Sequence, residues 1–183
     1  TNNTMTPAMR ASIVARHNEL RNKVASGGES GQPKASDMLE VVWDTELEGL
    51  MQSWVNTCPT GHNPNRVTTN YQYGIGENLY WSIGSVFDPV PGINLWYGEV
   101  TKFSSSNIDT YTFSTSTGHY SQVVWHNSNK IGCGFAVYGT TTAFGCNYVK
   151  PGNYGGQKVY TRGEPCASCP NQCSSTYTSL CKT

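Results

Sequence analysis

The stretch "IGCGFAVYGTTTAFGCNY", residues 131–148, decides the expected fold, because it has the pattern of a β-hairpin. Gly139-Thr140 would form a two-residue turn with glycine first, as a type II′ turn prefers. This register places Cys133 directly opposite Cys146 and brings their Cβ atoms within the range that a disulfide requires. We therefore expect a hairpin that is crosslinked near its middle.

The two faces of this hairpin differ in side-chain size. The large residues fall on one face, namely Ile131, Cys133, Phe135, Val137, Phe144 and Cys146. The small residues fall on the other, namely Gly132, Gly134, Ala136, Ala143 and Gly145. A large face packs a core, and a small face admits close packing by another layer. The hairpin therefore predicts a sandwich with helices on both sides of a sheet.

Three segments are expected to supply helices. The first has Thr6 as its cap and Pro7 in its first turn, and it ends at Gly27-Gly28. The second runs from about residue 44 to 55, and the third begins within residues 91–100. The polar stretch 104–117 is expected to be a long loop.

Composition excludes two kinds of partner. The chain of 183 residues carries 12 basic and 12 acidic side chains, so no basic surface for nucleic acid is expected. No apolar run approaches the roughly 18 residues that a membrane span needs. The chain starts at Thr1 without methionine or an apolar leader, and we expect it to be a processed product.

Seven cysteines indicate an oxidising compartment and hence secretion. Four of them lie in the last eighteen residues, and they are Cys166, Cys169, Cys173 and Cys181. Four cysteines permit three pairings, and a zinc cluster is the alternative interpretation. Asn2-Asn3-Thr4 is a sequon for N-glycosylation if the chain is secreted, so Asn2 is a candidate glycan site.

Four side chains are candidates for chemistry. His62 and His119 offer imidazole nitrogens to zinc or copper, whereas Glu77 and Glu99 could orient those imidazoles or carry protons. Their spacing alone is weak evidence, since none forms a compact metal-binding helix signature. Each also has a structural interpretation, such as a solvated loop histidine or the polar side of a helix. We interpret His17 and Arg21, which share a helix face, as structural.

Four short motifs carry a family resemblance. "GHYSQVVWHNS" (118–128), "FGCNYVKPGNY" (144–154), "HNELR" (17–21) and "GENL" (76–79) occur in this order. The chain resembles the family of cysteine-rich secretory proteins, antigen 5 and plant pathogenesis-related proteins, known as the CAP family. Within it, the chain is most similar to activation-associated and venom-allergen-like proteins of parasitic nematodes. Lys150 departs from the second motif, in which a proline is usual at this position.

The resemblance implies both a fold and a site. The fold would be α+β, a three-layer α-β-α sandwich over residues 1–163, followed by a small disulfide-tied tail over residues 164–183. The family's cavity residues correspond to His62, Glu77, Glu99 and His119, and its histidines bind a divalent metal, often zinc. The hinge of related proteins favours the tail pairs Cys166–Cys173 and Cys169–Cys181.

Three functions follow from this resemblance. The first is a secreted, non-enzymatic effector or binding protein of a parasitic nematode, with an unidentified host protein or lipid as partner and with weakly bound zinc. The second is a metal-dependent hydrolase with a glutamate as base, although catalytic zinc usually has three protein ligands. The third is a sterol or lipid carrier. Ser121 is a poor nucleophile, because no third group is evident to orient a base.

Cys58 is left over when the other six cysteines are paired. Many relatives pair this cysteine with one that follows the "GCG" position, but "GCGFAVYGTTT" (132–142) contains no second cysteine. A leftover thiol in a secreted protein is either buried and inert or joined to another molecule. The sequence leaves both open, and a bridged thiol would give a symmetric homodimer through Cys58.

Overall fold

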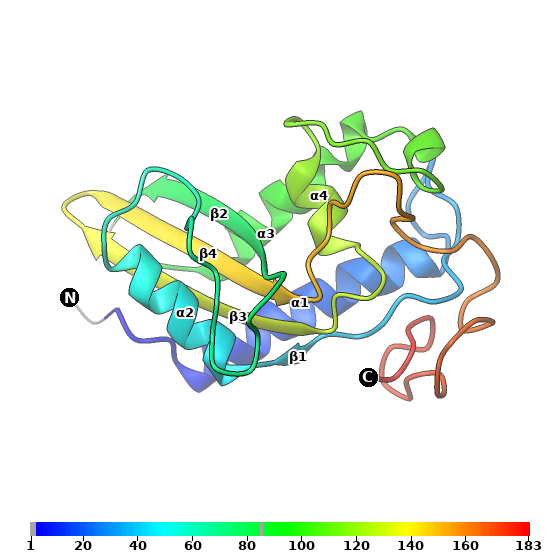
Figure 1. Ribbon diagram of the computed structural model, residues 1–183, viewed down its shortest axis with the longest axis horizontal. Coiled ribbons are helices and arrows are strands. Elements are labelled where there is room, and N and C mark those ends of the chain that lie inside the picture. The colour runs from blue at the N-terminus through cyan, green and yellow to red at the C-terminus, as the bar shows by residue number, and fades with distance from the viewer. Residues whose placement is uncertain (1–2, 85) are drawn as a thin grey trace.

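The computed structural model describes residues 3–84 and 86–183, and it is a four-stranded sheet with helices on both faces (Figure 1). The glycosylation candidate Asn2 lies outside the described residues. Strands β3 (Lys130–Tyr138) and β4 (Thr141–Val149) form the central hairpin. Cys133 pairs with Cys146 across the hairpin and forms a disulfide with it, as the alternation of residues predicted.

Two further strands flank the hairpin. β2 (Gly76–Ile83) pairs antiparallel with β4, and β1 (Val42–Trp43) pairs parallel with β3, which gives the order β1-β3-β4-β2. Neither strand was predicted from the sequence. The aromatic and β-branched residues between Gly76 and Gly84 are the signal that could have identified β2.

Helix α2 (Thr45–Val55) covers the small face of the hairpin, and glycine makes this contact possible. A Cβ atom at Gly132 would lie 2.1 Å from the backbone nitrogen of Glu48, and one at Gly134 would lie 2.7 Å from that of Gln52. Any larger residue would therefore push the helix off the sheet. The predicted difference between the two faces is confirmed.

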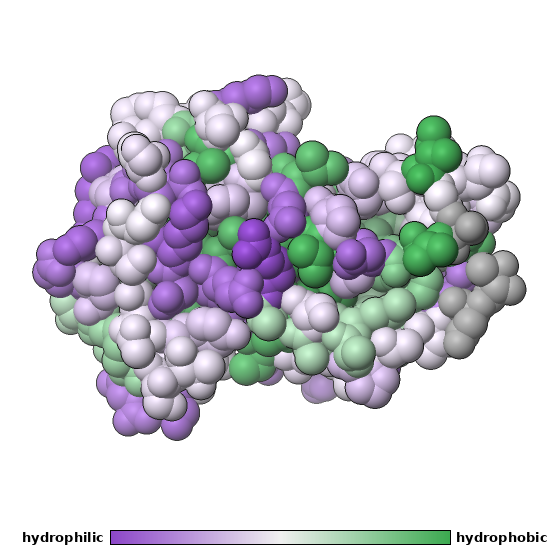
Figure 2. All heavy atoms as spheres, turned by 180° about the vertical axis from the view of Figure 1, so that it is seen from behind, coloured by the Kyte–Doolittle hydropathy of each residue, from purple (hydrophilic) through white to green (hydrophobic). Residues whose placement is uncertain are grey.

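Helices α1 (Pro7–Ala25) and α3 (Pro89–Gly98) cover the large face, where the main hydrophobic core lies. Thr6 caps α1 and Gly27 follows it with φ +82°, as predicted. Helix α3 begins two residues earlier than the predicted range 91–100, because Asp88 caps it and Pro89 opens it. Seen from behind, hydrophobic residues gather at the hairpin end of the molecule (Figure 2).

Buried polar groups tie α1 to the rest of the core. His17 is fully buried between the carbonyl oxygen of Ile13 and the hydroxyl of Tyr148, at 2.9 Å from each. The buried Arg21 guanidinium donates five hydrogen bonds to backbone carbonyls, namely those of Leu39, Val123, Trp125 and His126. Both residues are therefore structural, as interpreted from the sequence.

The region after α3 differs from the prediction in detail. Glu99 was placed on the third helix, but α3 ends at Gly98, and Glu99 opens a 3₁₀ helix that runs to Lys102. The expected loop 104–117 contains one more 3₁₀ turn, Ser105–Asn107. The short helix α4 (Gly118–Val123) follows it and begins the first family motif.

The tail has the predicted disulfides, Cys166–Cys173 and Cys169–Cys181. It also packs on the sandwich. Leu180 is fully buried and belongs to the main core, and the backbone of Cys181 bonds to Met38 and Glu40 at 2.7 and 2.9 Å. The tail is therefore docked through both main-chain and apolar contacts. The division into two domains at residue 163 stays a prediction.

Candidate functional site

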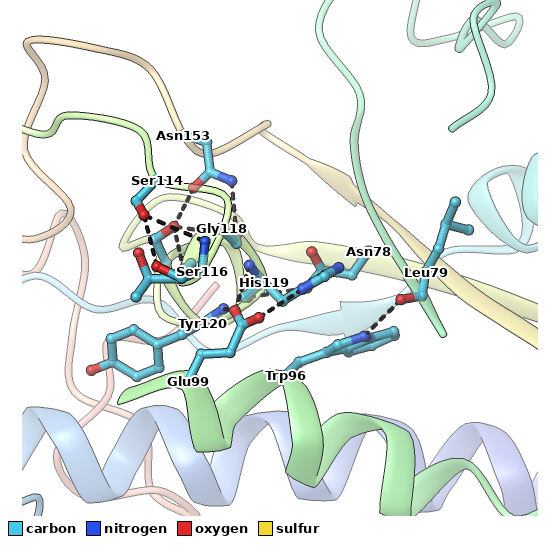
Figure 3. A network of polar contacts seen from close by, with 12 residues as sticks. Asn78, Leu79, Trp96, Glu99, Ser114, Ser116, Gly118, His119, Tyr120 and Asn153 are labelled. Atoms are coloured by element: carbon cyan, nitrogen blue, oxygen red, sulfur yellow. Dashed lines mark hydrogen bonds and ion pairs between the residues drawn. The ribbon is translucent and has the colours of Figure 1, made fainter. Parts of the chain in front are cut away.

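His119 lies at the start of α4, and Glu99 holds it in place (Figure 3). One carboxylate oxygen of Glu99 accepts hydrogen bonds from the backbone nitrogens of His119 and Tyr120, each at 2.9 Å. The other oxygen lies 2.9 Å from His119 Nδ1. The carboxylate thus caps the first turn of α4, where backbone N–H groups lack partners within the helix. The same contact fixes the imidazole.

Trp96 supports the other side of this imidazole. Its ring stacks on that of His119 with an interplanar angle of 14° and a centroid separation of 6.2 Å. Trp96 is 2% exposed, and its indole nitrogen donates to the carbonyl of Leu79 at 3.0 Å (Figure 3). The plane of His119 is therefore set by a side chain that is itself held on α3.

Glu77 holds His62 in a similar way. It lies on β2 with only 1% of its side chain exposed, and its Oε1 lies 2.8 Å from His62 Nδ1. The same oxygen accepts from the backbone nitrogen of Asn63 at 2.9 Å, and Oε2 accepts from Asn147 at 3.2 Å. These bonds compensate for burial of the charge. The guanidinium of Arg66 is a nearby cation, since its Nη1 lies 3.9 Å from Glu77 Oε1.

The two histidines line one cavity of about 220 Å³. Glu77 lines it as well, whereas Glu99 stands behind His119. An ionised carboxylate can only accept hydrogen bonds, so each Nδ1 carries the proton and each Nε2 keeps a free lone pair. Both imidazoles are thereby set in the tautomer that a metal ligand needs.

The structure thus brings together His62, Glu77 and His119 and places Glu99 directly behind them. Sequence reasoning missed Asn63 and Asn147, which hold the Glu77 carboxylate. The pairing of β2 with β4 sets Asn147 directly opposite Glu77, so only a prediction of β2 could have found this contact.

Ser121 is bonded away from His119. Its hydroxyl is fully buried, and it lies 2.6 Å from Asn153 Oδ1 and 2.9 Å from the hydroxyl of Tyr111. Burial raises the pKa of the Tyr111 phenol, which therefore stays protonated at neutral pH. Ser121 helps to fix α4, as Asn153 also does by donating to the carbonyl of Gly118 at 2.8 Å.

The donor set fits a metal with few protein ligands. Within the described parts of the chain, no group of three His, Cys, Asp or Glu side chains is arranged to hold a metal ion. Two Nε2 atoms on one cavity, each with a carboxylate behind the ring, fit a site that takes its other ligands from solvent or from a bound molecule.

The fold and this pair of His–Glu contacts define a known class. The model of the cysteine-rich secretory protein family, CAP, matches residues 14–148, and the chain belongs to this family. The family resemblance and the three-layer α+β fold inferred from the motifs are therefore confirmed.

Relatives by sequence include venom proteins. Scoloptoxin SSD552 of Scolopendra dehaani is 39% identical over 94% of this chain and 83% of its own length. Venom allergen 5 of Rhynchium brunneum is 40% identical over 81% of this chain and 70% of its own length. The predicted special similarity to nematode proteins therefore holds only in part.

Two solved structures have a fold similar to that of this chain. A structure described as NaASP2 with Zn2+ has a TM-score of 0.86 and 29% identity, over 99% of this chain and 98% of that one. Na-ASP-1 has the same TM-score and 31% identity, over 99% of this chain but 48% of its own. These nematode proteins share the whole fold, including the region of the tail.

Proposed function

We propose that this protein is a secreted, non-enzymatic binding or effector protein whose cavity takes a divalent metal, zinc in the first instance. The observation that carries the proposal is the matched pair of carboxylates behind His62 and His119. Each carboxylate fixes a ring and leaves its Nε2 free at the same cavity. A zinc ion there would be held weakly by two imidazoles and would offer its remaining positions to a ligand.

Secretion is supported by three disulfides in a chain of 183 residues. None of the helices among the described residues is long and apolar enough to cross a bilayer. The venom names of the relatives support an effector that acts on another organism. The similarity to the two nematode proteins keeps a parasite effector that acts on a host protein or lipid as our more specific proposal.

Two alternatives have less support. A metal-dependent hydrolase would use Glu77 as its base, but that carboxylate is almost fully buried and its oxygens are occupied by three partners. A sterol or lipid carrier would need an apolar cavity. Of the eight residues that line the His–Glu cavity, however, Phe113 is the one large apolar side chain.

Zinc titration by calorimetry tests the proposed function. We expect one weak site that is lost in a His62→Ala, His119→Ala double variant. Zinc affinity should fall as the pH is lowered, since protons compete with the metal for the imidazole nitrogens. Undiminished binding in the double variant would refute the assignment.

A carboxylate variant separates orientation from direct ligation. Glu99→Gln should weaken zinc binding about 10- to 100-fold, because it removes the charge behind His119 without touching Nε2. Glu164→Gln is the matched control. Glu164 is 77% exposed, forms an ion pair with Lys34 and does not line the His–Glu cavity. Equal affinities for both variants would show that Glu99 has no part in metal binding.

A further inference from the structure

The His–Glu cavity is one end of a longer groove. It shares His62, Glu77 and Asn153 with a second cavity of about 670 Å³. That cavity shares Gly74, Pro151 and Tyr154 with a third of about 370 Å³. The second and third cavities lie within the range of about 300–1,000 Å³ that is usual for small-molecule sites. The shared lining residues place the three cavities side by side, and together they are called the groove.

The walls of this groove are held in place by short contacts. Arg66 donates to the carbonyls of Ile75 and Asn63, both at 3.0 Å, and so closes its own loop. On the opposite wall, the backbone nitrogen of Gly152 donates to Gln122 at 2.9 Å. These hydrogen bonds within the walls indicate a groove that exists before a ligand arrives.

Every section of the groove is lined by at least one exposed aromatic ring. Phe113 lines the His–Glu cavity and is 57% exposed. Tyr154 lines the middle section and is 47% exposed, and Tyr73 lines the last section and is 94% exposed. Such rings present an apolar face that a sugar ring can cover, and a tyrosine hydroxyl adds a polar group.

The groove also offers amide side chains without partners. Asn65 borders the middle section, and Asn127 and Gln157 border the last one. In the described part of the chain these three side chains make no hydrogen bond, although Asn127 Oδ1 is buried, which leaves the amide nitrogen of Asn127 for a ligand. An amide both donates and accepts, which suits hydroxyl groups that do the same.

The charge of the groove argues against a strongly acidic or basic ligand. Its carboxylate, Glu77, is buried and engaged by three hydrogen-bond donors. Arg66 is partly used by backbone carbonyls, which leaves Lys150 as the exposed lysine of the lining. A ligand with many charges would therefore find few partners.

We propose that this groove binds a neutral oligosaccharide, whose sugar rings stack on Tyr73, Tyr154 and Phe113 and whose hydroxyls bond to the free amides. The proposal extends the proposed function, because the groove opens into the His–Glu cavity. An extended peptide is a weaker candidate. The groove lies where β2 begins and β4 has ended, so a peptide could pair with no more than the first residues of the edge strand β2.

Calorimetry of the disulfide-intact chain with cellotetraose, chitotetraose and maltotetraose tests the proposal. At least one of these should bind, and Tyr73→Ala and Tyr154→Ala should each weaken it about tenfold. Leu95→Ala is the matched control, since Leu95 is 59% exposed on α3 and lies outside the groove. Thermal unfolding of each variant shows that its fold is intact.

Further titrations distinguish a neutral oligosaccharide from other ligands and from the metal site. Binding of a heparin tetrasaccharide alone, or of an uncharged extended peptide alone, would overturn it, as would binding of none of the probes. The unsubstituted chain, titrated without added zinc, should still bind the tetrasaccharide. Absence of zinc binding with retained sugar binding would therefore refute the metal site alone.

Discussion

At the scale of single residues, the structure decides whether the thiol of Cys58 is buried, a question that the sequence left open. The thiol is free and exposed, one residue before a buried proline, so the interpretation as an inert buried cysteine is wrong. The apolar face of α2 ends at Val55, and the chain then turns outward. Cys58 itself has φ +54°, in the left-handed region that costs an L residue about 1–2 kcal/mol.

This exposure gives a prediction for the thiol. We expect the non-reduced protein to react with iodoacetamide at Cys58, unless the thiol is already bridged to a second chain. Non-reducing electrophoresis distinguishes the two states, since a homodimer through Cys58 would run at twice the monomer mass. A monomer that gains no mass on alkylation would contradict an accessible thiol. Cys58→Ser is the control that should abolish both the label and any dimer.

The site could be predicted from the sequence residue by residue only through its motifs. Composition and spacing did not relate His62 to Glu77, because that contact depends on a loop folding back over the start of β2. Glu99 was assigned to the site, but its role as a cap of α4 depends on α3 ending at Gly98, just before Glu99. Asn147 faces Glu77 only through strand pairing, which leaves no trace in the local sequence.

At the scale of elements, the packing of α2 on β3 rests on glycine. Gly132→Ala should destabilise the protein by about 3 kcal/mol or more, because its Cβ would meet the backbone of Glu48 at 2.1 Å. Gly49→Ala is the matched control, since a Cβ there meets nothing within 4 Å and α2 gains about 1 kcal/mol of helix propensity. Urea unfolding measures both changes, and equal stabilities would contradict the close contact.

The hairpin and the first two helices were predictable because their signals are local. Alternation, a glycine turn and caps at Thr6 and Asp44 lie within a few residues of the elements that they define. β1 and α4 were not predictable in this way, since they are only two and six residues long. Their conformations follow from neighbours that are distant in the chain.

Helix α1 carries a pH-dependent contribution to stability. Burial lowers the pKa of His17 from 6.5 to about 4, so the folded protein holds this ring neutral. The unfolded chain binds this proton first as the pH falls, and stability is therefore full above pH 6.5 and is lost towards pH 4. The shift corresponds to about 3 kcal/mol. Urea unfolding between pH 7.5 and 4 should show this loss.

His17→Gln provides the comparison for this pH effect. The variant cannot take up a proton at residue 17, so its stability should decline less over the same pH range, although it starts lower. The other three histidines are the same in both proteins. Identical pH profiles for the two proteins would show that His17 does not contribute. The proton resonances of the His17 ring give an independent measure of its pKa.

At the scale of the whole molecule, the tail determines whether the chain unfolds as one unit. Sequence reasoning placed a boundary at residue 163 because the cysteines cluster after it. In the structure, the tail returns to the body. Ser179 bonds to Asn22 of α1 at 2.9 Å, and Ser174 Oγ bonds to Glu40 at 2.9 Å. Such contacts couple the tail to the core.

We therefore expect the oxidised protein to unfold in a single transition that includes the tail. Leu180→Ala should lower the stability of the whole chain by about 2–5 kcal/mol, because Leu180 is fully buried in the main core. Ser175→Ala is the control, since this residue of the same segment is exposed. Calorimetry measures the midpoint of unfolding, and hydrogen exchange measures the protection of backbone amides in the tail and in the sandwich. Loss of protection confined to residues 164–183, with an unchanged midpoint for the sandwich, would support the separate domain that the sequence predicted. A lower midpoint throughout would show that the body depends on its tail.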